Sequence, residues 1–167
     1  AKRALEVTRN GRIGGVGTEG TIRSGAYDHV LRESRAVIVV HSAACPLFVP
    51  IAEEGWSSHE VARLAAREYL APLLDKGIDT LVLGCTHYPL LKKTLQEVVG
   101  ADVQLVDSAQ ETAKSVRLRL EQDQLLQSAA AAQPPCYYVT DIPDRFVRVG
   151  GAFLGEELRD VKTVVLD

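Results

Sequence analysis

Short apolar segments rich in Val, Ile and Leu alternate along this chain with longer segments whose apolar residues recur at helical spacing. The short segments predict strands over residues 12–17, 36–40, 80–83, 103–106, 137–140 and 163–166. The longer segments predict helices over residues 1–7, 20–33, 46–54, 57–76, 90–99, 108–127 and 144–154. Because strands that alternate with helices form parallel sheets, this order predicts an α/β fold in which helices cover the sheet.

Individual residues refine these expectations. The run Ala36–Val40 is apolar at every position, as in a strand that is covered on both faces. Ser57 and Glu60 have the spacing of a capping box, and Gly77 is a natural end for the helix that follows them. Residues 129–135, which comprise four alanines, a glutamine and two prolines, have the composition of a linker. The tail beyond this linker is therefore expected to pack as a separate unit.

Three turns follow predicted strands and carry the residues of most chemical interest. They are Gly17-Thr18, the segment 42–46 and the segment 84–87. If the strands are parallel, the three turns lie at the same edge of the sheet. Ligands of open α/β sheets bind beyond the carboxyl ends of the strands, so this edge is the expected place for a functional site.

The hexapeptide Gly84–Pro89 holds the strongest candidate, because it places Cys85 where a buried strand turns into a helix. Backbone N–H groups at such a turn favour a negative charge, such as that of a thiolate. His87, two residues further on, can supply or accept a proton. Free cysteines are often simply buried, but the adjacent Gly84 and the nearby His87 favour a reactive thiol over that structural interpretation.

Two further positions could complete such a site, and each also has a structural interpretation. Glu53 follows the turn at Cys45, so its carboxylate could orient the imidazole of His87, although acidic turns are usually just solvated. Thr18 lies at the start of a predicted helix, and we expect it to be the N-cap, with carboxylate binding as the alternative.

The other two cysteines are expected to be structural. Cys45 ends a strand before Pro46, and Cys136 lies in a β-like segment beyond the linker, so both are interpreted as buried thiols. A zinc site made from Cys45, Cys85 and His87 is disfavoured, because Cys-x-His is not a common spacing in structural zinc sites. No metal site is therefore predicted.

Composition narrows the class of protein. The net charge is -3 and no cluster of Lys and Arg is present, which argues against binding to nucleic acid or to a membrane surface. The longest apolar runs are too short to span a membrane. Three cysteines form an odd and sparse set, which disfavours a disulfide framework and favours the cytoplasm. The sequence contains no Met and begins at Ala1, which suggests part of a longer chain.

The segment Leu83–Leu91, with the sequence Leu-Gly-Cys-Thr-His-Tyr-Pro-Leu-Leu, resembles the second catalytic motif of glutamate racemases. Other blocks are similar to further segments of that family, so the resemblance covers essentially the whole chain. They are Gly17-Thr18-Glu19-Gly20-Thr21-Ile22 with Ser24 and Ala26-Tyr27, residues 45–50 with Glu53 and Gly55, residues 106–108 with 111–113, residues 138–140 and residues 153–155.

The resemblance implies a racemase that interconverts L- and D-glutamate without a cofactor and supplies D-glutamate for peptidoglycan, and hence for cell-wall biogenesis and cell shape. In this family two cysteines on opposite faces of the substrate α-carbon exchange its proton. Cys85 would be the second of these cysteines, with His87 assisting proton transfer and binding substrate and Glu53 as its carboxylate helper. Thr86 and Thr18 would bind substrate.

This sequence lacks three family segments: the Asp-Ser-Gly loop, the Ala-Cys-Asn-Thr loop with the first catalytic cysteine, and the Pro-Tyr-Gly segment. We therefore expect residues 1–107 to be the second, flavodoxin-like α/β domain, with a parallel sheet covered by helices. Residues 108–167 would be the crossover helix and the C-terminal part of a first domain that is mostly missing. Such a chain is expected to be inactive by itself.

The expected partners are glutamate, the missing N-terminal domain of the same protein and, in a homodimer, a second copy of the chain. Neither nucleic acid nor a membrane is expected. Two alternatives stay open at this point. One is another thiol-dependent racemase, of the aspartate or hydantoin type, and the other is a non-catalytic binding module that keeps the fold.

Overall fold

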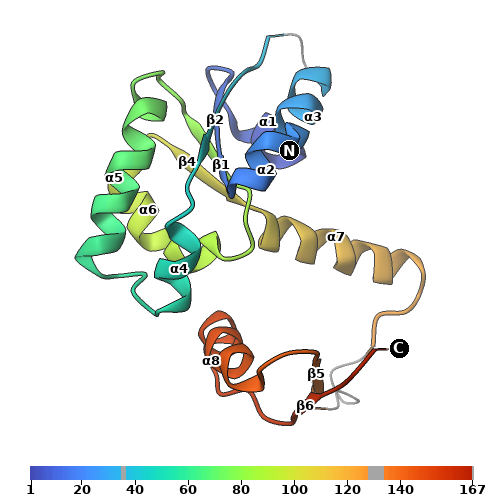
Figure 1. Cartoon of the computed structure of the whole chain (residues 1–167). Helices are drawn as coiled ribbons and strands as arrows, with labels where there is room; N and C mark the ends of the chain where they lie inside the picture. The colour runs from blue at the N-terminus through green and yellow to red at the C-terminus, as the bar shows by residue number, and fades with distance from the viewer. Residues whose placement is uncertain (35–36, 128–133, 167) are drawn as a thin grey trace. The chain divides into compact units, whose positions relative to one another are not determined.

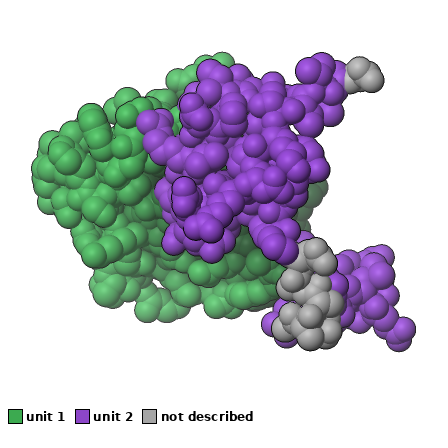
Figure 2. All heavy atoms as spheres, turned by 90° about the horizontal axis from the view of Figure 1, so that it is seen from below, with its two compact units in different colours: residues 1–115 green, residues 116–167 purple. Residues whose placement is uncertain are grey.

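The computed structural model of the chain describes residues 1–34, 37–127 and 134–166. It divides into two compact units, residues 1–115 and residues 116–167, which Figure 2 shows in different colours. The boundary between the two units lies inside the predicted crossover helix, whereas the sequence predicts a boundary before that helix, between residues 107 and 108. The assignment of residues 108–167 to a second racemase domain stays a prediction.

The first unit contains a four-stranded parallel sheet (Figure 1). Its strands are β1 (Arg12–Gly17), β2 (Val39–Ala44), β3 (Thr80–Leu83) and β4 (Gln104–Asp107). Their order in the sheet is β2-β1-β3-β4, which is the order of flavodoxin-like sheets. The predicted α/β class and parallel sheet are thus confirmed.

Helices cover both faces of this sheet. They are α1 (Lys2–Val7), α2 (Glu19–Ser24), α3 (Ala26–Ser34), α4 (Phe48–Glu53), α5 (Glu60–Leu74), the 3-10 helix η1 (Tyr88–Leu91) and α6 (Lys92–Val99). Helix α7 (Ser108–Gln122) follows β4 and has no buried residue. Figure 1 shows α4, α5 and α6 on one side of the strands and α1, α2 and α3 on the other.

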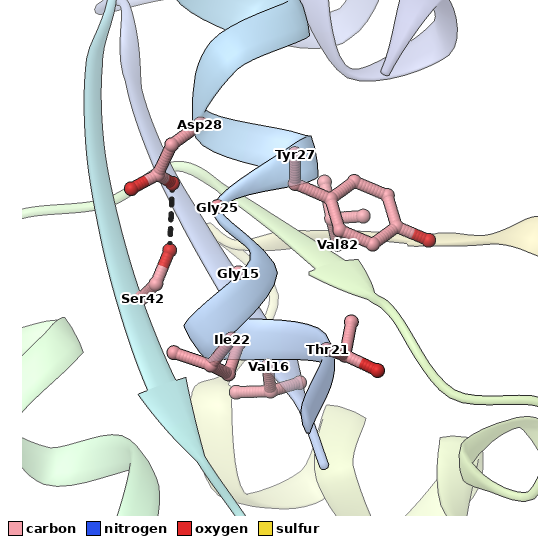
Figure 3. Close-up of a pocket in the computed structure, with 9 residues that line it drawn as sticks. All are labelled: Gly15, Val16, Thr21, Ile22, Gly25, Tyr27, Asp28, Ser42 and Val82. Atoms are coloured by element: carbon pink, nitrogen blue, oxygen red, sulfur yellow. Dashed lines mark hydrogen bonds between the residues drawn. The ribbon is translucent and has the colours of Figure 1, made fainter. Parts of the chain in front are cut away.

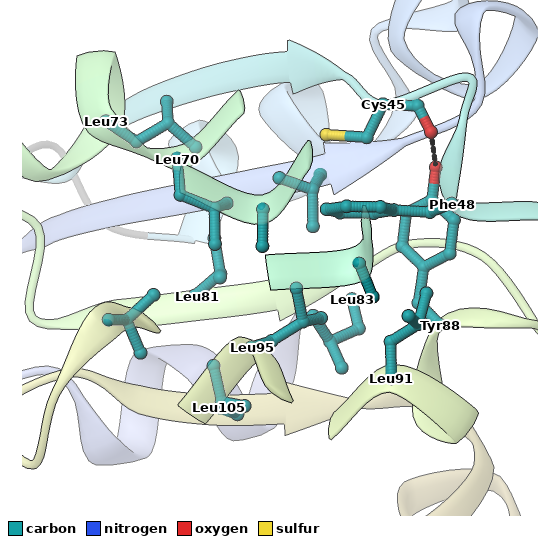
Figure 4. Packing of buried hydrophobic residues seen from close by; sticks show 14 of the residues in the cluster. Cys45, Phe48, Leu70, Leu73, Leu81, Leu83, Tyr88, Leu91, Leu95 and Leu105 are labelled. Carbon is teal, nitrogen blue, oxygen red and sulfur yellow. Dashed lines mark hydrogen bonds between the residues drawn. The ribbon is translucent and has the colours of Figure 1, made fainter. Parts of the chain in front are cut away.

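Side chains alternate along the strands between two hydrophobic clusters. In β3, Leu81 and Leu83 belong to the larger cluster, which α4, α5, η1 and α6 complete (Figure 4). Val82, between them, belongs to the smaller cluster with Ala4 of α1 and Leu31 of α3. Because successive side chains of a strand point to opposite faces, every position of β3 is buried, as its apolar sequence predicts.

Strand β2 differs from the prediction, which placed it over residues 36–40. It begins at Val39 and continues to Ala44, Val37 is 83% exposed, and residue 36 lies outside the described residues. The reason is pairing: the strand begins opposite Arg12 and ends opposite Gly17, so the neighbouring β1 sets both of its ends.

Two predicted helices also differ from those in the structure. The single helix predicted over residues 20–33 is two helices, because Gly25 adopts a left-handed φ of 62° between α2 and α3. The helix predicted from Ser57 begins instead at Glu60, and the Nδ1 atom of its N-cap, His59, accepts a hydrogen bond of 3.2 Å from the Val61 N–H. Glu60 is therefore the first helical residue. A capping box with Ser57 would require Glu60 to be the third.

The second unit contains β5 (Tyr137–Val139), α8 (Pro143–Leu154) and β6 (Val161–Thr163), and its two strands are parallel neighbours. The last strand was predicted over residues 163–166, and that prediction is wrong. Only three residues of β5 are available for pairing, so β6 ends at Thr163 and Val165 is 90% exposed. Most of the predicted linker lies outside the described residues.

Among the helices of the described residues, none combines the length and the apolar composition that crossing a bilayer requires.

Candidate active site

The order of the strands has a switch point at β1, and ligands of open α/β sheets bind beyond the carboxyl ends of the strands at such a point. The chain leaves β1 for β2 on one side and returns to β3 on the other, so the loops after β1 and β3 diverge at their carboxyl ends. The Cys45 N–H donates to the Gly17 carbonyl at 2.9 Å, and the Gly84 N–H donates to the Val16 carbonyl at 2.7 Å. These bonds confirm that the three predicted turns share one edge of the sheet.

Cys85 lies in the turn after β3, half-buried, with its side chain packed against the larger hydrophobic cluster. A Cβ atom on the preceding Gly84 would lie 2.9 Å from both the Val16 carbonyl oxygen and the Tyr27 ring, so only glycine fits there. The α-helix predicted from Leu90 begins later, at Lys92, after the 3-10 turn η1. Cys85 thus precedes a 3-10 turn, and the α-helix follows one turn further on.

His87 and Glu53 lie together although they are far apart in the sequence. The Nε2 atom of His87 is 3.3 Å from Oε1 of Glu53, and their side chains are 26% and 17% exposed. Glu53 is the last residue of α4, and His87 precedes η1. On the other side of the imidazole, Nδ1 is 3.4 Å from the hydroxyl of Thr86. An imidazole between a carboxylate and a hydroxyl is suited to taking up and returning a proton.

Thr18 lies at the same edge, at the end of β1. Its hydroxyl accepts a hydrogen bond of 3.3 Å from the Thr21 N–H, and the two hydroxyl oxygens are 3.0 Å apart. Thr18 is therefore the N-cap of α2, which confirms that structural prediction. Its role in binding a carboxylate stays a prediction.

The remaining cysteines occupy different environments. Cys45 is fully buried, and burial raises the pKa of its thiol to about 12, so the thiol is protonated at neutral pH and the prediction of a structural role holds. Cys136, in the second unit, is exposed, so the expectation that it is buried is wrong. Cys136 directly precedes β5, and in the described part of the chain the sheet to which β5 belongs has only two strands, which is too small to bury the Cys136 side chain. Within residues 1–34, 37–127 and 134–166, no three His, Cys, Asp or Glu side chains are grouped as a metal site requires.

This edge also holds an ion pair that the sequence did not predict. Nζ of Lys92 lies 2.6 Å from Oδ2 of Asp107, the last residue of β4. Burial alone would raise the pKa of Asp107, but hydrogen bonds from the Gln110 N–H and from Lys92 outweigh it and hold the pKa below its usual range. The sequence feature that could have indicated this ion pair is an acidic residue at the end of an apolar strand, just before a helix.

A small pocket opens between β1, β2 and the start of α3 (Figure 3). It is lined by Gly15, Val16, Thr21, Ile22, Gly25, Tyr27, Asp28, Ser42 and Val82. The Ser42 hydroxyl donates a hydrogen bond of 2.8 Å to the Asp28 carboxylate across it. Its free volume of about 10 Å³ is close to that of one water molecule, so this pocket is too small for an amino acid.

Comparisons with known proteins agree with one another. The family model "Asp/Glu/Hydantoin racemase" matches residues 1–116. Among curated proteins, the glutamate racemase of Geobacter metallireducens is 52% identical over 167 residues, and that of Chlorobaculum parvum is 43% identical over 164 residues. These matches cover 100% and 98% of this chain but 62% and 60% of the relatives. The chain therefore spans about three fifths of the length of the curated relatives that it matches.

Solved structures of the same kind are similar over nearly all of the chain. A glutamate racemase isoform from Bacillus anthracis matches with a TM-score of 0.84 and 32% identity, covering 99% of this chain and 61% of that one. The enzyme of Francisella tularensis, solved in complex with D-glutamate, matches with a TM-score of 0.84 and 37% identity, covering 94% of this chain and 59% of that one.

Proposed function

The chain belongs to the Asp/Glu/Hydantoin racemase family, and on this premise we propose that the full-length protein interconverts L- and D-glutamate. The observation that carries the proposal is the half-buried Cys85 in the turn after β3, two residues before His87, whose imidazole pairs with Glu53. The high identity to glutamate racemases and the likeness to an enzyme solved with D-glutamate support this substrate. The product would supply D-glutamate for peptidoglycan. Three free cysteines favour the cytoplasm as its location.

In the proposed reaction Cys85 exchanges a proton with one face of the substrate α-carbon. An amino-acid α-proton is weakly acidic, so a thiolate must be held in contact with it while the developing carbanion is stabilised. The thiolate takes the proton in one direction of the reaction, and the thiol gives it back in the other. His87, paired with Glu53, assists this transfer and contacts the substrate, while the hydroxyls of Thr18 and Thr86 hold substrate carboxylates.

Inversion of configuration requires a second thiol on the opposite face of the α-carbon. When one thiolate removes the α-proton, the opposing thiol delivers its own proton, and each turnover exchanges the protonation states of the two sulfurs. The other cysteine of the first unit, Cys45, is buried and protonated, so it does not fit this role. We propose that the second thiol belongs to the N-terminal domain of the same protein, outside these 167 residues.

The test is racemisation by the full-length protein, followed by circular dichroism from pure L- and pure D-glutamate. Wild type is expected to reach the same end point from both sides. Cys85→Ser should reduce the rate by about a thousandfold or more, because the serine hydroxyl stays protonated at neutral pH and is a far weaker proton acceptor than a thiolate. Cys136→Ser is the matched control and should leave the rate unchanged.

Two results would contradict the proposal. One is a Cys85→Ser variant with the wild-type rate, and the other is a full-length wild type that racemises aspartate or a hydantoin and leaves glutamate unchanged. The 167-residue polypeptide alone is expected to leave the optical rotation of L-glutamate constant, because it would lack the second thiol. Sustained loss of rotation would show that these residues suffice.

A further inference from the structure

We propose that Tyr88 is a positioning residue that holds His87 against Glu53. The Tyr88 side chain is fully buried, and its hydroxyl donates a hydrogen bond of 2.9 Å to the backbone carbonyl of Cys45 (Figure 4). This bond joins the turn after β3 to the turn after β2, at the edge where the candidate site lies. The part of the proposal that concerns catalysis rests on the proposed racemase function.

The bond connects the two short helices that carry the imidazole and the carboxylate. The Cys45 carbonyl also accepts the Phe48 N–H at 3.1 Å, which fixes the first residue of α4. Tyr88 is the first residue of η1, and His87 directly precedes it. Glu53 ends α4, one and a half turns beyond Phe48. The Cys45 carbonyl is thus a shared anchor for both helices, and it sets the distance between the His87 and Glu53 side chains.

The surrounding packing leaves the Tyr88 hydroxyl little freedom. The Tyr88 ring meets the Phe48 ring edge to face, with centroids 5.2 Å apart and planes at 86°. Burial raises the pKa of Tyr88, so the hydroxyl keeps its proton and stays a donor at every pH at which the protein would work. The Cys45 carbonyl oxygen is therefore a permanent partner for it.

Replacement of Tyr88 by Phe isolates this bond. The ring keeps its place in the hydrophobic cluster, and the Cys45 carbonyl keeps the hydrogen bond from Phe48, so no buried acceptor is left unpaired. The variant should therefore fold. Tyr69→Phe is the matched control, because Tyr69 packs edge to face on the same Phe48 ring at 5.3 Å and the described structure gives its hydroxyl no hydrogen-bond partner.

The experiment compares wild type, Tyr88→Phe and Tyr69→Phe in the full-length protein. The first measurement is the NMR signal of the isotope-labelled His87 ring nitrogens, which reports the contact with Glu53 and needs no activity. We expect Tyr88→Phe to shift this signal and Tyr69→Phe to leave it in place. The second is racemisation, where Tyr88→Phe should lower kcat by about tenfold with little change in KM, because a small misplacement of a catalytic group is costly.

A double-mutant cycle separates positioning from general stability. If Tyr88 acts through Glu53, then Tyr88→Phe should cost little more once Glu53→Gln is present, so the two effects on kcat should not add. Additive effects, or an unchanged His87 signal in Tyr88→Phe, would overturn the proposal. If wild type leaves both glutamate enantiomers unchanged, the proposed function fails, and the NMR comparison still decides the positioning role.

Discussion

The exposure of each cysteine decides what its thiol can do. Cys45 is fully buried and its pKa is raised to about 12, Cys85 is half-buried at the edge of the sheet, and Cys136 is exposed. Only a thiolate is a good nucleophile or proton acceptor, so Cys45 is excluded from chemistry while the fold is intact. The sequence distinguishes Cys85 from the other two cysteines by its neighbours Gly84 and His87, but it does not show that Cys45 is buried while Cys136 is exposed.

Alkylation of the folded protein tests this ranking. At about pH 8, iodoacetamide should modify Cys85 and Cys136 and leave Cys45 unmodified until urea unfolds the chain, because burial both shields the Cys45 thiol and keeps it protonated. Peptide mapping by mass spectrometry gives the rate at each site. Modification of Cys45 in the folded protein as fast as Cys136 would contradict the assignment. Faster modification of Cys85 than of the more exposed Cys136 would argue against a non-catalytic binding module.

Asp79 is a buried carboxylate with a structural task. It lies at the start of β3 and is 7% exposed. Its oxygens accept hydrogen bonds from the Thr8 hydroxyl at 2.7 Å and from the Arg9 and Asn10 N–H groups at 2.6 Å and 2.7 Å. Burial alone would raise the pKa of Asp79, but these bonds and one from Thr80 outweigh it and lower the pKa. Asp79 thereby holds the turn between α1 and β1.

Asp79→Asn is therefore expected to destabilise the protein by about 2 kcal/mol at neutral pH, since an amide accepts fewer of these hydrogen bonds. The folded pKa lies below the unfolded value of about 4, so this stabilisation is complete above that value and is lost as the pH falls through the folded pKa. Urea unfolding at several pH values measures both effects. Asp75→Asn, an exposed carboxylate at the end of α5, should change little. An equal loss in both variants would contradict this role for Asp79.

At the scale of elements, pairing partners and single glycines set the boundaries. The apolar pattern predicts β3 at its observed ends because all four of its residues are buried. It misplaces β2 because the ends of that strand are set by pairing with β1. The local sequence of β2 carries no information about where β1 begins and ends. Gly25 divides a predicted helix in two because its left-handed backbone ends α2. A glycine in a helical pattern is compatible with continuation or with a stop, and only the backbone decides.

The strand-to-turn junction at Gly84 gives a prediction of its own. Gly84→Ala should destabilise the protein by about 2 kcal/mol, because the new methyl group would meet the Val16 carbonyl and the Tyr27 ring at 2.9 Å. It should also lower racemisation by the full-length protein, since Cys85 is the next residue. Urea unfolding and circular dichroism measure the two effects.

Gly20→Ala is the matched control for this substitution. Gly20 lies within α2, and a Cβ atom there would have no neighbour within 4 Å. Alanine should stabilise that helix by up to about 1 kcal/mol. The steric argument is wrong if Gly84→Ala is as stable as wild type.

At the scale of the whole molecule, the second unit contains a stretch of chain between α7 and β5 whose described residues lie outside helices and strands. Helix α7 ends at Gln122, and β5 begins at Tyr137. Between them, the described residues 123–127 and 134–136 are all exposed. Proteases cut preferentially at exposed backbone of this kind.

Limited proteolysis tests this organisation. Elastase, which cuts after small residues, is expected to cleave first between residues 123 and 136, where the sequence contains four alanines. Trypsin is the matched comparison, because that segment contains no Lys or Arg and the first tryptic cut must fall elsewhere. Mass spectrometry of the early products identifies the cuts. A first elastase cut inside residues 12–106 would contradict the expectation that the segment between α7 and β5 is the most accessible part of the chain.

The sequence by itself determined the α/β class, the strand β3, and the short segment that carries Cys85, Thr86 and His87, because apolar periodicity and turn residues are local properties of the chain. Only the tertiary structure decided which thiol is buried, brought His87 within 3.3 Å of Glu53, and joined Tyr88 to the Cys45 carbonyl. These features depend on contacts between residues far apart along the chain. The hydrophobic pattern predicts that such residues meet in a core, but it does not specify which atoms touch.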